Sequence, residues 1–214
     1  GSYGATSCTK QDTPCAEGQG WYRPEAGIDA SCAQCEAGHA CLDSAKTKCS
    51  PGWYQERTGQ TECEPCDKGT YGPAEAATNS SQCVPCDTGT YNENEGESKK
   101  YACTTCPEGT ASDKTGRVSE SDCTPCGPGT YMPFRGAGSC VSCPDGSYAE
   151  NSQSKECTRC PAMTYQDPST SSRNSSSSCL SCPAGTSSPT GSSGASSCIA
   201  GEIVCGGHRV FHDG

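Results

Sequence analysis

The stretch from Cys66 to Tyr91, CDKGTYGPAEAATNSSQCVPCDTGTY, decides the fold because it holds one complete unit and the start of the next. It opens with the phrase CDKGTY, runs through a polar loop and reaches the C-x2-C pair of Cys83 and Cys86. The second cysteine of that pair opens the phrase again, as CDTGTY. Self-similarity of this kind is typical of tandem-repeat proteins. We therefore interpret the chain as a tandem array.

The same order of phrase, polar loop and C-x2-C pair extends over most of the chain. C-x2-C occurs eight times, at Cys32/Cys35, Cys63/Cys66, Cys83/Cys86, Cys103/Cys106, Cys123/Cys126, Cys140/Cys143, Cys157/Cys160 and Cys179/Cys182. The phrase that follows the second cysteine reads CPEGTA at Cys106, CGPGTY at Cys126, CPDGSY at Cys143, CPAMTY at Cys160 and CPAGTS at Cys182. Single cysteines open it earlier, at Cys15 and Cys49.

Composition excludes a conventional hydrophobic core. The chain has 214 residues and 22 cysteines, but only 12 Leu, Ile, Val and Phe, and its mean hydropathy is -0.71. Ordering a residue costs about 1.5 kcal/mol, which so few apolar side chains cannot offset. Covalent cross-links must therefore hold the fold. A Rossmann sheet, a TIM barrel, a helical bundle and most enzymes are excluded.

Cysteine density and charge indicate the environment. Thiols at this density form disulfides only in an oxidising compartment, so we expect an extracellular or cell-surface protein. No signal peptide and no apolar run of about 20 residues are present, so we expect a mature segment without a membrane span. The net charge of -10 and the pI of about 4.7 disfavour nucleic acid and anionic lipid as partners.

The simplest pairing scheme joins each cysteine that opens a phrase to the first cysteine of the following C-x2-C pair. Bonds inside a C-x2-C pair would leave the long loops free, so we disfavour them. Each loop of 13 to 18 residues would then stabilise the fold by about 3 kcal/mol. The scheme gives Cys15–Cys32, Cys49–Cys63, Cys66–Cys83, Cys86–Cys103, Cys106–Cys123, Cys126–Cys140, Cys143–Cys157, Cys160–Cys179 and Cys182–Cys198.

Four cysteines remain. Cys35 and Cys41 close a short C-x5-C loop, while Cys8 and Cys205 lie at opposite ends in matching contexts, GATSC and GASSC each followed by a further cysteine seven positions on. Joining two copies head to tail places 16 residues between Cys205 and the next Cys8, the length of four internal loops. We expect this segment to continue head to tail, within one polypeptide or through bonds between chains. A chance match in length and a cloning origin for the first Gly-Ser stay open.

Two further positions repeat with the cysteines. Glycine occurs three positions after the opening cysteine nine times, which predicts a backbone site with positive φ or close chain approach. Met163 breaks this rule, so its turn is expected to differ. Tyrosine recurs five positions after the cysteine, where packing over a disulfide and the next turn is favoured over a ladder of ligand-binding rings. These tyrosines are Tyr54, Tyr71, Tyr91, Tyr131, Tyr148 and Tyr165.

The phrase C-x2-G-[TS]-Y, the loop and the closing C-x2-C resemble the cysteine-rich repeats of ephrin-receptor-like and tumour-necrosis-factor-receptor-like ectodomains. The resemblance covers Cys15 to Cys198, and the disulfide pairing in those families agrees with the scheme above. EGF and laminin modules fit worse because they use a C-x-C step, which is absent here. The long run of near-identical units also resembles large surface proteins of protists and algae, including flagellar hair (mastigoneme) proteins.

Other chemistry finds little support in the sequence. Zinc ribbons share the C-x2-C spacing but use isolated sets of four thiolates, and a redox dithiol would need a basic neighbour such as Arg159. His208 and His212 are read as loop residues, and Asn92 to Glu97 only partly resembles a calcium loop. We expect no catalytic, cofactor or metal site. Asn79 and Asn174 lie in N-glycosylation sequons, and the stretches 169–178 and 187–197 are compatible with O-glycans.

The predicted fold is small and disulfide-rich: an elongated rod of tandem repeats, each touching only its neighbours, with short β-hairpins and very little helix. Residues 1–62 form irregular repeats, 63–198 regular ones, and 199–214 start a further repeat. The predicted function is that of a non-enzymatic, glycosylated structural segment of a filament, flagellar hair or coat, which assembles with itself or with other surface proteins. The alternative is the ligand-binding ectodomain of a receptor, or a protist adhesin or antigen, in which departures from the repeat would cluster on one side.

Overall fold

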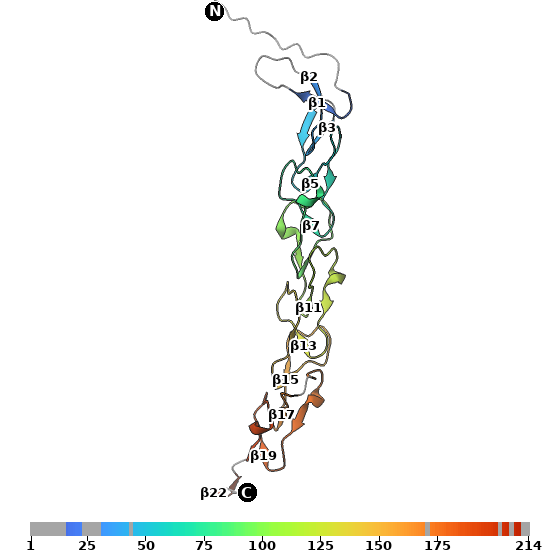
Figure 1. Cartoon of the computed structure of the whole chain (residues 1–214). Coiled ribbons are helices and arrows are strands. Elements are labelled where there is room, and N and C mark those ends of the chain that lie inside the picture. Colours follow the sequence, from blue (N-terminus) through green and yellow to red (C-terminus); the bar gives the residue numbers. More distant parts are fainter. Residues whose placement is uncertain are drawn as a thin grey trace, which may run out of the picture. The chain divides into compact units, whose positions relative to one another are not determined.

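The computed structural model describes residues 16–22, 31–42, 45–169, 172–200, 203–205 and 208–210 (Figure 1). Within these ranges the regular structure consists of short β-strands and single 3-10 turns, and no described residue is in an α-helix. Each strand pairs with its neighbour in the chain to form a two-stranded sheet. The prediction of a small disulfide-rich fold built from tandem hairpins is confirmed, while the arrangement of the repeats as a rod stays a prediction.

The strands are mostly two to four residues long. The pairs from the first part of the chain are β1 (Gln19–Tyr22) with β2 (Ser31–Gln34), β3 (His39–Leu42) with β4 (Ala45–Lys48), β5 (Trp53–Tyr54) with β6 (Glu64–Pro65), β7 (Thr70–Tyr71) with β8 (Val84–Pro85) and β9 (Thr90–Tyr91) with β10 (Thr104–Thr105). The later pairs are β11 (Thr110–Ala111) with β12 (Thr124–Pro125), β13 (Thr130–Tyr131) with β14 (Val141–Ser142), β15 (Ser147–Tyr148) with β16 (Thr158–Arg159), β17 (Thr164–Gln166) with β18 (Cys179–Ser181), β19 (Thr186–Ser187) with β20 (Ile199–Ala200) and β21 (Ile203–Cys205) with β22 (His208–Val210).

The hairpin β7–β8 shows how one repeat closes. Thr70 pairs with Pro85 and Tyr71 with Val84, in antiparallel register. The first strand is thus the T-Y of the phrase, and the second is formed by the two residues inside C-x2-C. Such short ladders are marginal by themselves in water, so the flanking disulfide supplies the closure that a longer sheet would otherwise provide.

The longer loops end in a 3-10 turn directly before the closing cysteine. Loops with a cysteine separation of 16 to 19 contain one, whereas the three loops with a separation of 14 do not. The extra residues are therefore absorbed at one place. These turns are η1 (Ser80–Gln82), η2 (Lys100–Ala102), η3 (Glu120–Asp122), η4 (Ser176–Ser178) and η5 (Ala195–Ser197).

The hairpin β21–β22 follows a different plan. Cys205 pairs with His208, so this cysteine lies within the strand pair. In the regular repeats the strand begins four residues after the opening cysteine, as Thr70 does after Cys66. The division into residues 1–62, 63–198 and 199–214 stays a prediction.

Half-cystines take the place of an aliphatic core. Each opening cysteine from Cys35 to Cys160 is at most 1% exposed. Among the side chains of residues 34–42, 45–169 and 172–200, the buried apolar ones other than cysteine are three alanines and Met132. The chain groups into two compact units, which interleave in sequence. The first consists of Gly1–Asp87, Tyr91–Thr104 and Thr115–Ser119, and the second of Thr88–Thr90, Thr105–Lys114 and Glu120–Gly214.

Candidate functional site: the interlock between repeats

We name each repeat by its opening cysteine and call the residue three positions later the turn residue. In the Cys66 repeat both the backbone N–H and the hydroxyl of Thr70 donate to the Asp67 carbonyl, at 3.1 and 2.7 Å. Gly69 lies between them with φ +78°, which is the conformation that a type II turn requires. The nine turn glycines have φ between +74° and +93°, as the sequence predicted.

Met163 makes this same turn, so the expectation that its turn would differ was wrong. Its φ is +65°, and the Thr164 N–H and hydroxyl donate to Pro161 at 3.3 and 2.7 Å. Both hydrogen bonds of the turn form, so the backbone of Met163 adopts the strained left-handed conformation and the turn type does not change. Room permits it, since the Met163 side chain is 63% exposed.

In seven of the loops a second positive-φ residue connects three successive repeats. We call these clamp residues; they are Gly59, Ala76, Gly96, Gly116, Gly136, Gln153 and Gly191. The N–H of Gly96 donates to the carbonyl of Cys66 in the preceding repeat, at 2.8 Å. Its own carbonyl oxygen faces Gly52, two repeats back, where an added Cβ would lie 2.1 Å away.

The clamp contact recurs with little variation inside each unit. All seven clamp N–H groups donate a hydrogen bond to the backbone carbonyl of an opening cysteine, at 2.7 to 2.9 Å. Seven turn glycines would meet a clamp carbonyl at 2.1 to 2.4 Å if they carried a Cβ. The expectation that each repeat touches only its neighbours was therefore wrong, because the loops also pack on the repeat two positions earlier. Glycine at the turn is required by this close approach as well as by its φ.

One repeat replaces the clamp by a side chain. At Cys143 the carbonyl accepts a hydrogen bond from the guanidinium of Arg173, which also pairs with the Asp145 carboxylate. We call the contact between a loop and the earlier repeats a seam. The seam at Gly129 is looser than the others, because a Cβ on this glycine would lie 3.4 Å from its nearest neighbour, the Arg173 carbonyl carbon. A groove of about 430 Å³ runs along this seam and includes the exposed Asn174.

The residue six positions after the opening cysteine forms the interior of the stack. It is buried in eight repeats, as Gln55, Gly72, Asn92, Ser112, Met132, Ala149, Gln166 and Ser188. At three repeats the residue in this position is polar and its side chain donates a hydrogen bond to a backbone carbonyl of the preceding repeat. The bonds are Asn92 to Thr70 at 2.9 Å, Gln166 to Ser147 at 3.0 Å and Ser188 to Thr164 at 2.6 Å. The hydroxyl of Ser112, by contrast, is buried and has no hydrogen-bond partner among the residues that the structure describes.

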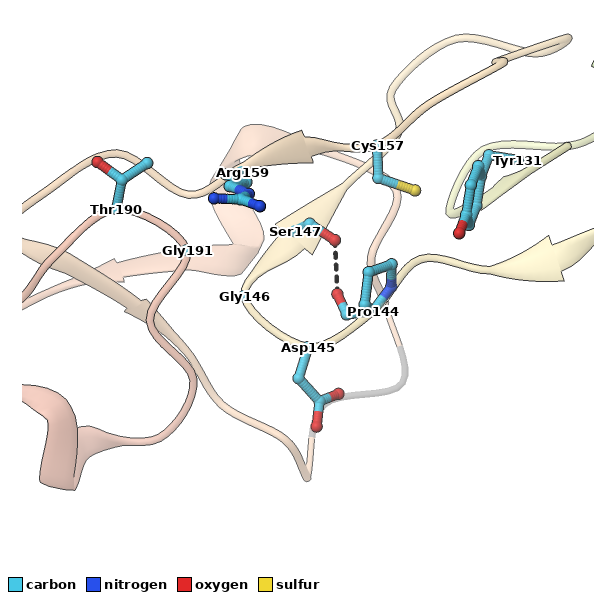
Figure 2. Close-up of a pocket in the computed structure, with 9 residues that line it drawn as sticks. All are labelled: Tyr131, Pro144, Asp145, Gly146, Ser147, Cys157, Arg159, Thr190 and Gly191. Carbon is cyan, nitrogen blue, oxygen red and sulfur yellow. Dashed lines mark hydrogen bonds between the residues drawn. The ribbon is translucent and has the colours of Figure 1, made fainter. Parts of the chain in front are cut away.

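The repeated tyrosines are half-buried. Tyr131 lies beside Cys157 and Pro144 of the next repeat, at one side of a shallow groove of about 380 Å³ (Figure 2). Arg159 and Thr190 line the other side, with the Asp145 carboxylate at the rim. Partial burial and the carboxylate of Glu64 raise the pKa of the Tyr54 phenol.

The structure bonds nine pairs of cysteines, and each pair is one that the sequence scheme contains. They are Cys35–Cys41, Cys49–Cys63, Cys66–Cys83, Cys86–Cys103, Cys106–Cys123, Cys126–Cys140, Cys143–Cys157, Cys160–Cys179 and Cys182–Cys198. The expected Cys15–Cys32 bond and the proposed partners Cys8 and Cys205 involve side chains outside the described residues.

Both sequons lie just before a 3-10 turn. The side-chain Oδ1 of Asn79 caps η1 by accepting a hydrogen bond from the N–H of Ser81 at 3.1 Å, and the Ser81 hydroxyl donates to the same oxygen. The Asn79 Nδ2, the atom that carries an N-linked glycan, makes no hydrogen bond to any described residue. Asn174 is exposed. Attachment of a glycan would leave the cap at Asn79 intact.

The ionisable side chains do not gather into a chemical centre. Within the described residues there is no group of three or more His, Cys, Asp or Glu able to hold a metal ion. Asn92, in the stretch that partly resembles a calcium loop, uses its amide to hold Thr70 and Asn94. A hydrogen bond from Lys46 lowers the pKa of Glu36, and one from the Ser176 N–H lowers that of Glu150.

The repeat geometry agrees with a comparison to known families. The family described as tyrosine-protein kinase ephrin type A/B receptor-like matches residues 38–83, 76–123, 117–156 and 129–177, which together cover well over half of the chain. The chain belongs to this ephrin-receptor-like family. A comparison with curated proteins finds no match.

Family membership and the disulfides together indicate an extracellular or cell-surface domain. Disulfide-rich repeats of the ephrin-receptor-like family are in general non-catalytic. In the part of the chain that the structure describes, no helix has the length and apolar character needed to cross a bilayer.

Proposed function

We propose that this ephrin-receptor-like chain is a structural segment of an extracellular filament, flagellar hair or surface coat, and that it has no enzymatic role. It would be glycosylated at Asn79 and Asn174 and would continue head to tail through the region of Cys205 and Cys8. Its partners would be further copies of itself or other surface and filament proteins.

The observation that supports this proposal is the order of the disulfides along the chain. From Cys49 to Cys198 eight disulfides follow one another, and each is separated from the next by only the two residues inside C-x2-C. Tension applied along the chain passes across every loop through a covalent bond. The loops carry none of it.

The lengths show what this arrangement achieves. With 5.6 to 5.8 Å between the bonded Cα atoms and about 3.4 Å per residue step in the spacers, the fully stretched path from Cys49 to Cys198 is ~120 Å. The same residues without disulfides would stretch to ~500 Å. The disulfides therefore limit the stretched chain to about a quarter of the length that the same residues could reach without them, which suits a component whose task is to keep a fixed length.

The sequons fit the same role. Asn79 and Asn174 occupy the loops, four and five residues before the closing cysteines, so glycans there would cover loop backbone and lie outside the series of disulfides itself. Electron microscopy of native material tests the proposal as a whole. Periodic filaments or hairs that are labelled by antibodies to this chain are expected, whereas its isolation only as dispersed monomers would contradict the structural role.

The alternative is a receptor or adhesin ectodomain, which the match to a receptor-like family favours. The groove between Tyr131 and Arg159 would then be the first place to look for a ligand. A saturable complex with a surface protein or glycan, lost in an Arg159→Ala variant but retained in a matched Arg135→Ala variant, would favour this alternative. Arg135 is an exposed arginine in a different repeat.

A further inference from the structure

The series of disulfides has one interruption, between Cys41 and Cys49. Elsewhere from Cys35 to Cys198, successive disulfides are separated by two residues, but here seven residues separate them. Those seven include the whole of β4, whose connection to β3 is made by hydrogen bonds in the register His39↔Lys48 to Leu42↔Ala45. No disulfide crosses this hairpin.

The strand β4 has few supports. Besides its ladder with β3 it lies against β1, where a Cβ added to Gly20 would meet the Cβ of Lys46 at 3.0 Å. All four of its residues, Ala45–Lys48, are exposed, so opening the strand costs little apolar burial. An ion pair between Lys46 and Glu36, at 2.7 Å, supports it from outside the ladder. Exposed pairs of this kind contribute little and are screened by salt.

The contacts between the Cys35 loop and the Cys49 repeat are of the usual kind. The N–H of Gly38 donates to Gln55 at 2.8 Å, and the N–H of Cys41 donates to Gln60 at 2.9 Å. Comparable hydrogen bonds hold the other seams, but there a rupture releases only the short C-x2-C spacer. The contact between the Cys35 loop and the Cys49 repeat differs because its rupture releases the seven residues between Cys41 and Cys49.

We propose that the segment Cys41–Cys49 is the extensible element of the chain, a hairpin that opens under tension while the disulfides keep the following repeats at fixed length. This inference rests on the proposed mechanical function and adds to it a defined point of compliance. An opened hairpin would let the residues before Cys41 turn independently of the array that starts at Cys49.

The expected extension follows from the register. Cys41 faces Lys46, so their Cα atoms are about 5 Å apart, and three further residues reach Cys49, which places the ends of the segment about 11 Å apart when it is closed. Stretched out, the eight residue steps span ~27 Å. Opening therefore lengthens the chain by about 15 Å in one step.

Single-molecule force spectroscopy on the oxidised full chain tests the inference. The handles are attached at Gln34 and Ile199, so that the hairpin β21–β22 lies outside the stretched part. The parent protein is expected to show a step of about 15 Å without added reductant. Ala40 and Thr47 are directly paired, at a separation that a disulfide can bridge, so the variant Ala40→Cys/Thr47→Cys should lack this step. The matched variant Ala40→Ser/Thr47→Ser should retain it, and peptide mapping would verify the new bond.

A second variant probes the ion pair. Lys46→Met is expected to shorten the lifetime of the closed hairpin at constant force by about two- to fivefold. Lys155→Met removes a comparable exposed pair, with Glu108 at 3.1 Å, and should leave that lifetime unchanged. Persistence of the 15 Å step in the stapled variant, or its absence from the parent, would overturn the inference. Failure to find filaments by microscopy would contradict the proposed function but would not remove the step.

Discussion

The contact between repeats two positions apart can be tested by adding a single methyl group. Gly69→Ala places a Cβ 2.4 Å from the clamp carbonyl of Gly116, which is backbone and cannot rotate away. Gly185→Ala is the matched control. Its φ of +81° is close to the +78° of Gly69, but an added Cβ there would meet no described atom within 4 Å.

The two variants share one cost and differ in another. An L residue in the left-handed region costs about 1–2 kcal/mol, and both variants incur this cost. In Gly69→Ala the clamp must also move by close to 1 Å to reach ordinary contact distance. Two hydrogen bonds flank it, from Gly116 to Cys86 at 2.8 Å and from Asn92 to Arg117 at 2.9 Å. At about 1 kcal/mol each, their loss makes the total cost about 3–4 kcal/mol.

Native-state hydrogen exchange of the oxidised protein is the appropriate assay, because local opening can be followed while the disulfides remain intact. In Gly69→Ala the amides of Gly116 and Asn92 are expected to lose about 30-fold more protection than the amides next to Gly185 lose in Gly185→Ala, from the 2 kcal/mol difference. Equal loss in the two variants would refute the reasoning, since the methyl group would then act only through its φ.

Three further predictions concern individual side chains. Met163→Gly is expected to raise the free energy of unfolding by about 1 kcal/mol, because it relieves a left-handed conformation and removes little buried surface, as thermal unfolding would show. Ser188→Ala should lower it by about 1 kcal/mol while Ser112→Ala leaves it unchanged or raises it, since only the first hydroxyl has a partner. The pKa of Glu36 lies below 4.5 in the folded chain, so its pairing with Lys46 stabilises the β3–β4 hairpin above pH 4.5 and is lost as the pH falls through the folded pKa; closed-state lifetimes under force should therefore shorten between pH 7 and pH 3.

The regular spacing of the cysteines made it possible to predict the repeat from the sequence. Because the phrase recurs at a fixed offset from each opening cysteine, the spacing indicated the loops, the positive φ of the turn glycines and the nine disulfides that the structure contains, while the Cys15–Cys32 bond stays a prediction. The short hairpins followed from the same frame. Each of these features depends on the residue type at one position within a repeat, so it can be predicted from the sequence of each repeat by itself.

The interlock was harder to read from the sequence. Six of the seven clamp residues stand ten positions after their opening cysteine, and Gly191 stands nine positions after Cys182, but two of the seven, Ala76 and Gln153, are not glycine. The buried position six residues after the cysteine carries residues as different as Gly72, Asn92 and Met132, so neither hydropathy nor residue type identifies it. What unites these positions is a backbone partner in another repeat, which appears only once the chain is folded.

The variable interior follows from the disulfides and explains why a chain with so few apolar residues can stack at all. Since the covalent bonds already limit the freedom of each loop, the interior needs only to fill space and satisfy backbone carbonyls, and a buried carboxamide such as Gln166 does both. A chain that relied on apolar burial for its closure would lose length as soon as the core opened. Here the noncovalent contacts set the stacking and the disulfides limit the extension, so tension that disrupts the contacts between Cys35 and Cys198 lengthens this part of the chain most at the β3–β4 hairpin, which no disulfide spans.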